Sequence, residues 1–150
     1  MTITQQRDAV VTEARTWIRT PYRHCARVKG AGVDCAMILA EVYSTVLAEF
    51  RDVDIPEYSP QWHLHHTDEI YLDIVRQYAS EVGTPLPGDI VVVKFGRAFA
   101  HGGIVTEWPN VVHAYMQAEQ VIEEDFDVNH ELSGRAHRFF SPWAKLGKVE

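Results

Sequence analysis

Hydrophobic residues in the N-terminal half of the chain recur at steps of three and four residues, which is the spacing of one face of an α-helix. This pattern predicts a first helix over residues 5–19, which ends where Pro21 excludes the preceding residue from helical geometry. It predicts a second helix over residues 35–47, whose apolar positions cover more than half of its circumference and therefore indicate a buried, central helix. A third helix is expected after Thr67, which can cap it, and ends before Gly83.

Beyond Gly88 the pattern changes to short β-branched runs bounded by turn residues, which is typical of strands. Turns are expected at residues 108–110 and 117–120. Three helices followed by roughly five antiparallel strands give an α+β order, within one domain over residues 1–150. The five expected strands are residues 90–95, 100–106, 111–116, 121–124 and 136–140.

Length and composition are those of a globular protein, with 150 residues of which 46% are hydrophobic and 23% charged. The net charge of −7 argues against a nucleic-acid-binding surface, which is normally basic. No stretch approaches the roughly 18 apolar residues of a membrane span, and the first residues lack the apolar segment of a signal peptide. We therefore expect a protein that is made in the cytoplasm and neither inserts into a membrane nor binds nucleic acid.

Cys35 is the candidate nucleophile. It follows Asp34 at the start of the second predicted helix, where unpaired N–H groups and the helix dipole lower the pKa of a thiol. The same position also suits a buried cysteine that acts as a small hydrophobe, so the helix alone leaves both interpretations open. The preceding loop is either a solvated connection or an approach to Cys35 that Tyr22 and Arg23 line.

The second cysteine and a histidine cluster raise other possibilities. A disulfide between Cys25 and Cys35 could close a loop, but cytosolic proteins seldom form one. A zinc site with these two cysteines would need closely paired ligands, a spacing that the sequence lacks. His63, His65 and His66 could bind a metal, although such a cluster is more often a solvated loop edge.

Two histidines in predicted strands can complete the chemistry of Cys35. A cysteine nucleophile needs a base within hydrogen-bond reach, and a third polar group that holds the base in one tautomer. His101 and His113 would fill these two roles. They are not directly opposite each other across the turn at residues 108–110, but Gly102 and Gly103 would allow a bulge that brings them together. Taken singly, each is also consistent with an ordinary strand histidine.

Several short motifs occur in an order that resembles the NlpC/P60 superfamily of cysteine peptidases. The resemblance covers roughly residues 8–140 and is greatest to a small branch encoded beside tail genes in phages, prophages and gene transfer agents, which residues 58–62 also fit. The motifs are Thr20-Pro21-Tyr22-Arg23, Asp34-Cys35, Gly88-Asp89-Ile90, His101-Gly102-Gly103-Ile104 and Val112-His113-Ala114.

The resemblance implies a papain-like fold with the nucleophile at a helix N-terminus packed on an antiparallel sheet. It implies hydrolysis of bacterial cell-wall stem peptides, typically between γ-D-glutamate and a diamino acid. Cys35 would be the nucleophile, His101 the base and His113 the orienting residue. Tyr22 would bind substrate or the oxyanion, and Asp34 would receive the free amine of the stem peptide or, alternatively, cap the helix.

Other positions near these motifs bear on specificity. Arg23 follows Tyr22 in its motif and is expected with it at the substrate site. Ala36 stands where many members have serine, and His24-Cys25 stands where many have two glycines. These departures leave the three catalytic positions intact and affect which substrate the protein would bind.

The resemblance implies no metal or organic cofactor. It implies association with the tail proteins of a phage or phage-like particle, in which the protein would be exported. The alternative function is a structural or assembly protein of the tail tip that keeps the fold with little or no catalysis. A third is an amide hydrolase or acyltransferase with a substrate outside the wall.

Overall fold

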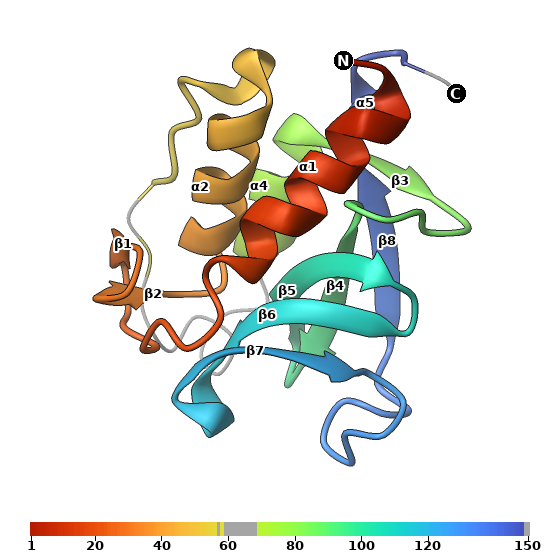
Figure 1. Cartoon of the computed structure of the whole chain (residues 1–150). Coiled ribbons are helices and arrows are strands. Elements are labelled where there is room, and N and C mark those ends of the chain that lie inside the picture. Colours follow the sequence, from red (N-terminus) through yellow and green to blue (C-terminus); the bar gives the residue numbers. More distant parts are fainter. Residues whose placement is uncertain (57, 59–68, 149–150) are drawn as a thin grey trace.

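A computed structural model describes residues 1–56, 58 and 69–148, and it confirms the α+β fold. Helices occupy most of the N-terminal half and an antiparallel sheet the C-terminal half (Figure 1). The elements are α1 (Ile3–Arg15), β1 (Arg27–Val28), β2 (Gly32–Val33), α2 (Met37–Val46), the 3₁₀-helix η1 (Ala48–Phe50), α4 (Ile70–Tyr78), β3 (Ser80–Val82), β4 (Ile90–Phe95), β5 (Ala98–Glu107), β6 (Asn110–Tyr115), η2 (Met116–Ala118), β7 (Gln120–Asp125), β8 (His137–Ser141) and α5 (Pro142–Lys145).

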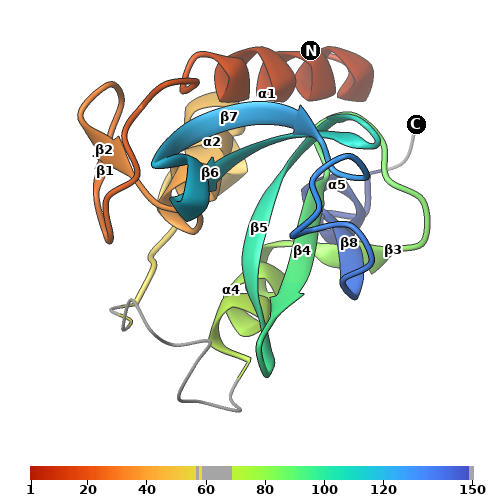
Figure 2. The same cartoon turned by 90° about the horizontal axis from the view of Figure 1, so that it is seen from below.

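The main sheet has six antiparallel strands in the order β3-β8-β4-β5-β6-β7. Side chains alternate between its faces, so Val92 and Ile104 pack against the helices, in the larger core. Val91 and Val105 face the other way, into a smaller core that also contains Leu132 from the loop between β7 and β8. Figure 2 shows this loop folded back over the sheet. The sheet therefore has a buried layer on each face.

The first helix is shorter than expected. It begins at a capping box formed by Thr2 and Gln5 and ends at Arg15, not near residue 19. The chain then turns through Arg19, which has a φ of 76°. The N–H of Arg19 donates to the carbonyl of Val121 at the outer edge of β7, and the N–H of Val121 donates to the carbonyl of Thr20. This edge pairing, which sequence periodicity does not show, ends the helix early.

The second helix begins at Met37, two residues after its expected start at Cys35, and the turn before it is capped by a side chain. The Asp34 carboxylate accepts hydrogen bonds from the N–H groups of Ala36 and Met37, at 3.2 and 2.9 Å. Cys35 therefore lies in the capped turn that leads into α2.

Each of the five expected strands is present, with bounds that differ by at most two residues. The sequence did not indicate β3, an edge strand of three residues, or the β1–β2 ribbon, whose strands have two residues each. The third helix is α4, and the proposed cap Thr67 lies outside the described residues. None of the helices in the described part of the chain is both long and apolar enough to cross a membrane.

A buried ion pair fixes α1 to the start of the sheet. Arg7 donates to Asp89 at 2.8 Å and to the carbonyl of Pro87 at 3.0 Å. Its guanidinium also lies over the ring of Trp143 at 4.2 Å from the centroid. The pair thus joins α1, β4 and α5. Asp89 of the Gly-Asp motif at residues 88–89 therefore has a structural role.

Candidate active site

The Cys35 sulfur lies against the edge of β5 where β6 separates from it. β5 and β6 pair only from Ile104 towards their hairpin turn, so the preceding part of β5 has an open edge. The thiol is 3.9 Å from the carbonyl oxygen of Ala100. The nearby backbone N–H of Gly102 lowers the pKa of the thiol. The residue is 5% exposed, and both cysteines of the chain are free, so no disulfide joins Cys25 to Cys35.

The expectation that the Cys35 thiol has a lowered pKa is wrong for this structure. Burial raises the pKa of the thiol, and the negative charge of Asp34 raises it further. Contacts with the Tyr22 hydroxyl and with the backbone N–H groups of Cys35 and Gly102 lower the pKa, but by less. In this structure the sulfur is therefore a neutral thiol that needs a base.

His101 comes directly after a β-bulge. Lys94 of β4 pairs with Phe99 and Val93 pairs with His101, so Ala100 is the extra residue in β5. The sequence allowed a bulge or bend at Gly102-Gly103 in the pairing of β5 with β6. The register between these two strands shifts instead between Val105 and Glu107, close to their turn. The bulge at Ala100 lets the backbone on both sides of His101 approach Cys35. The imidazole of His101 packs against the ring of Phe95, with ring centroids 5.5 Å apart.

The two histidines meet as expected. Nε2 of His101 and Nδ1 of His113 are 2.8 Å apart, which is a hydrogen bond. Nδ1 of His101 has no hydrogen-bond partner among the described residues. Burial, with the neighbouring His113, holds the pKa of His101 well below 6.5, so the imidazole is neutral at pH 7.

The glycines beside His101 are required by close approaches. A Cβ on Gly103 would lie 2.8 Å from both the Cβ of His113 and the carbonyl oxygen of Val112. A Cβ on Gly102 would lie 2.5 Å from the hydroxyl of Tyr71, which donates to the carbonyl of Cys35 at 2.8 Å. The pair thus lets β6 and α4 approach the site.

Tyr22 is held beside Cys35 by the strands around it. Its N–H donates to the carbonyl of Glu119 at the start of β7, and it forms a parallel bridge with Val33. The hydroxyl interacts with the Cys35 thiol, and burial together with that thiol raises the pKa of the phenol, which stays a donor. Arg23 instead points to the β1–β2 ribbon, where it donates to the carbonyl of Ala31 at 3.2 Å.

The Asp34 carboxylate is fully buried and accepts four hydrogen bonds. Two come from the start of α2, as described above. The other two come from the N–H of Cys25, at 2.7 Å, and from the hydroxyl of Tyr58. This supports the helix-capping interpretation of Asp34, and its binding of a substrate amine stays a prediction.

His24 and Cys25 are exposed and lie with Asp34 in a group whose potential ligand atoms are within 4.8 Å of one another. Nε2 of His24 is 3.2 Å from the Cys25 sulfur and 3.0 Å from the carbonyl oxygen of Tyr58. Because Asp34 already accepts four hydrogen bonds, it has no lone pair left for a cation without losing one of them. The proposed metal candidates His63, His65 and His66 lie outside the described residues.

The chain was compared with family models, with curated proteins and with solved structures. No family model matches the chain, and no curated protein matches it. Solved structures do match it. The NlpC/p60 domain of the peptidoglycan hydrolase SagA is 19% identical, with a TM-score of 0.57 over 88% of this chain and 96% of that chain. NlpC2 from Trichomonas vaginalis is 14% identical, with a TM-score of 0.64 over 91% of this chain and 48% of that chain.

The fold is that of NlpC/P60 domains. An N-acetylmuramoyl-L-alanine amidase from Bacteroides uniformis also has this fold, at 14% identity and a TM-score of 0.56 over 91% of this chain and 98% of that chain. The NlpC/P60 fold was expected from the motifs around Cys35 and His101, so the comparison confirms the fold class. At these identities, chemistry has to be argued from the site itself.

One residue at the site was missed from the sequence. Glu124 lies in a run of three acidic residues in β7, a pattern that is typical of a solvated strand, yet its carboxylate is 2.7 Å from Nε2 of His113. The register of the β6–β7 hairpin could have indicated that Glu124 lies near His113. The turn at residues 117–120 pairs His113 with Ile122, and Glu124 lies two residues further along the same face.

Proposed function

We propose that this protein is a cysteine peptidase that cleaves the stem peptides of peptidoglycan through Cys35, His101 and His113. The observation that supports this proposal most is that Cys35, His101 and His113 come together on an NlpC/P60 fold. A thiol lies against the backbone on both sides of His101, and the imidazole of His101 is bonded to His113. The bond that we propose lies between γ-D-glutamate and a diamino acid, by resemblance.

The proton of the thiol moves in the first step. Because the thiol is neutral and the His101 imidazole is unprotonated, Nδ1 of His101 takes the proton as the sulfur bonds to the carbonyl carbon. The same proton passes to the departing amine, which leaves an acyl thioester on Cys35. Water then attacks the thioester, with His101 again as the base, and releases the acid.

Donors beside the sulfur can stabilise the oxyanion. The backbone N–H of Cys35 and the Tyr22 phenol both lower the pKa of the thiol, so both are donors available beside the sulfur. Either group can donate to the oxygen that becomes negative when the sulfur attacks, a contribution worth roughly 100-fold to 1000-fold per donor. Asp34 and Arg23 remain proposed substrate contacts.

Digestion of purified sacculi tests this proposal. Wild type is expected to release soluble muropeptides whose masses show a cut at one peptide bond, and Cys35→Ala is expected to release none. His101→Ala should be as inactive as Cys35→Ala, while Cys25→Ser, which changes the exposed thiol, should cut at the same bond as wild type. Equal products from wild type and Cys35→Ala would exclude the enzymatic function.

We also propose that the protein works in the tail of a phage or phage-like particle, where local wall cleavage would help DNA to enter. This proposal is supported by the resemblance of residues 20–23 and 58–62 to the tail-associated branch. Particles purified from a strain that encodes the protein should contain it in a fixed ratio to tail proteins, and its complete absence from intact particles would refute the proposal.

The burial of Cys35 favours a second candidate, a structural protein of the tail tip that has the same fold with little catalysis. A thiol that is 5% exposed and has a raised pKa behaves as a core residue. If this candidate is correct, Cys35→Ala should assemble into particles normally and the particles should be equally infectious or equally able to transfer DNA.

A further inference from the structure

We propose that Glu124 is a positioning residue of this site, at the outer end of a relay that runs from His101 through His113. The inference rests on the proposed function, because the relay matters only if His101 acts as a base. The three side chains come from neighbouring strands β5, β6 and β7. Nε2 of His101 is 2.8 Å from Nδ1 of His113, and Nε2 of His113 is 2.7 Å from Oε2 of Glu124.

The relay fixes the tautomers of both imidazoles. An ionised carboxylate only accepts hydrogen bonds, so Nε2 of His113 carries its proton towards Glu124. Nδ1 of a neutral His113 is then an acceptor, and Nε2 of His101 must be the donor. Nδ1 of His101 is left with a lone pair, which is what a base for the Cys35 thiol requires. Without the carboxylate, His113 can take the other tautomer, in which its Nδ1–H donates to Nε2 of His101. His101 then carries its own proton on Nδ1 and has no lone pair there.

Glu124 also supplies charge where the reaction needs it. Although burial raises the pKa of its carboxyl, hydrogen bonds from His113 and Asn129 outweigh that effect and lower it, so the group is ionised at neutral pH. When His101 takes the thiol proton, its imidazolium lies one ring away from this negative charge. This attraction stabilises the protonated form of His101.

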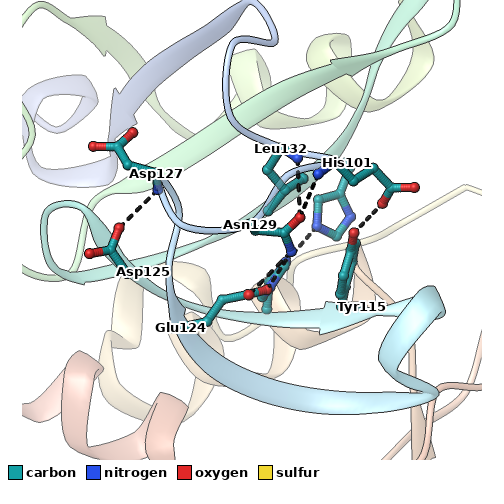
Figure 3. A network of polar contacts seen from close by, with 9 residues as sticks. His101, Tyr115, Glu124, Asp125, Asp127, Asn129 and Leu132 are labelled. Carbon is teal, nitrogen blue, oxygen red and sulfur yellow. Dashed lines mark hydrogen bonds and ion pairs between the residues drawn. The ribbon is translucent and has the colours of Figure 1, made fainter.

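The carboxylate of Glu124 is held in place by the loop that follows β7. Nδ2 of Asn129 donates to its two oxygens at 3.2 and 3.1 Å. The side-chain oxygen of Asn129 in turn accepts from the N–H groups of Glu131 and Leu132, and Leu132 is fully buried. Figure 3 shows Asn129 between this loop and Glu124. The loop therefore orients Glu124 through one amide side chain.

The residue beside Glu124 provides a matched contrast. Glu123 lies on the other face of β7, where it pairs with Arg15 at 3.0 Å and accepts from Thr106 at 2.9 Å. The two side chains are similarly exposed, 26% for Glu123 and 23% for Glu124. Among the described residues Glu124 has no lysine or arginine partner, and its only basic partner is His113.

Three variants test the relay, with two measurements. Nitrogen-15 NMR of the imidazoles should show His101 of wild type neutral, with Nδ1 unprotonated. Glu124→Ala should move part of His101 to the Nδ1–H tautomer. Glu124→Gln keeps the size of the side chain, but its amide can accept or donate and therefore fixes neither tautomer. Glu123→Gln should leave the His101 signals as in wild type.

Kinetics on a soluble muropeptide give the second measurement. We expect kcat to fall about 10-fold or more in both Glu124 variants with KM unchanged. The acidic limb of the pH profile should move to lower pH, because a negative charge that favours protonated His101 is gone. Glu123→Gln should keep the wild-type kcat and pH profile.

The relay would be refuted by wild-type kcat and wild-type His101 signals in both Glu124 variants, or by an Nδ1–H tautomer of His101 in wild type. The NMR measurement needs no substrate. If wild type cleaves no muropeptide at all, the proposed function fails, and the tautomer of His101 still decides whether Glu124 positions it.

Discussion

Protonation of the Cys35 thiol determines how the site can work. A thiol at the start of a helix would ordinarily ionise more readily, but here the sulfur is buried and next to the Asp34 carboxylate, and both effects raise its pKa. The neutral His101 imidazole fits this state, since it can accept the proton only when it is unprotonated itself. Attack and proton transfer are therefore coupled, as they are for a serine nucleophile.

The first prediction concerns alkylation. Iodoacetamide at pH 7 should label the exposed Cys25 faster than Cys35, and the rate at Cys35 should still rise above pH 9, because only the thiolate reacts and the pKa of Cys35 is raised. Peptide mapping by mass spectrometry separates the two sites.

Asp34→Asn is the informative variant for this measurement. Its amide oxygen can still accept from the start of α2, whereas the charge that raises the pKa of Cys35 is lost. Labelling of Cys35 at pH 8 should therefore be faster than in wild type. Labelling of Cys35 ahead of Cys25 at pH 7 in the wild-type protein would contradict the neutral thiol.

The second prediction is the acidic limit of activity. Because burial and His113 lower the pKa of His101 well below 6.5, the imidazole stays unprotonated, and able to act as a base, down to that lower pKa. The acidic limb of kcat/KM against pH for muropeptide cleavage should therefore lie below pH 6.5. A limb centred above pH 6.5 would show that His101 is more exposed, or more strongly stabilised as a cation, than this structure has it.

At the scale of elements, β5 does most to build the site. Its bulge at Ala100 exposes backbone groups to Cys35, and its two glycines allow α4 and β6 to approach. The third prediction is that Gly103→Ala lowers kcat at least about 10-fold, because the new Cβ would lie 2.8 Å from the Cβ of His113 and displace the relay. Activity and circular dichroism measured together check it.

Gly83→Ala is the matched control for this substitution. No atom lies within 4 Å of where its Cβ would be, so activity should stay at the wild-type level. A fully active Gly103→Ala would show that the position of β6 against β5 does not matter for the reaction.

Local patterns predicted the elements that form from local signals and missed those that depend on pairing. β-branched residues at 90–95 identify β4, and the spacing of apolar residues identifies α2. The early end of α1 depends on the pairing of Thr20 with β7, and β3 exists only because β8 lies beside it. Neither partner is near in sequence, so neither effect is visible in a local window.

The same division holds within the site. Cys35, His101 and His113 could be proposed because their residue types suggest the chemistry and their motifs resemble a family. The burial that raises the pKa of Cys35 depends on how α2 and β5 pack, which spacing does not give. Glu124 was hidden because a run of acidic residues usually indicates a solvated face.

At the scale of the whole molecule, the helical half has to keep its position on the sheet for Cys35 to lie against β5. The pair of Arg7 and Asp89 is a buried polar link between them, with side-chain exposures of 9% and 2%. The fourth prediction is that Asp89→Ala lowers the free energy of unfolding by about 3 to 5 kcal/mol, because it removes the carboxylate that faces the buried Arg7 charge. Urea denaturation measures this.

An exposed ion pair serves as the control. Lys148 and Glu49 are each 36% exposed, so Lys148→Ala should change the free energy of unfolding by no more than about 1 kcal/mol. Equal losses in Lys148→Ala and Asp89→Ala would show that the Arg7–Asp89 pair does not hold the two halves together.

The most direct test of the central claim is the mass of the intact protein after acid quench during turnover of a muropeptide. The account predicts a species heavier than the free enzyme by the acyl part of the substrate, located on Cys35 by peptide mapping and absent from Cys35→Ser. Release of the cleaved products at the wild-type rate by Cys35→Ser, with no adduct on the wild-type protein, would contradict it.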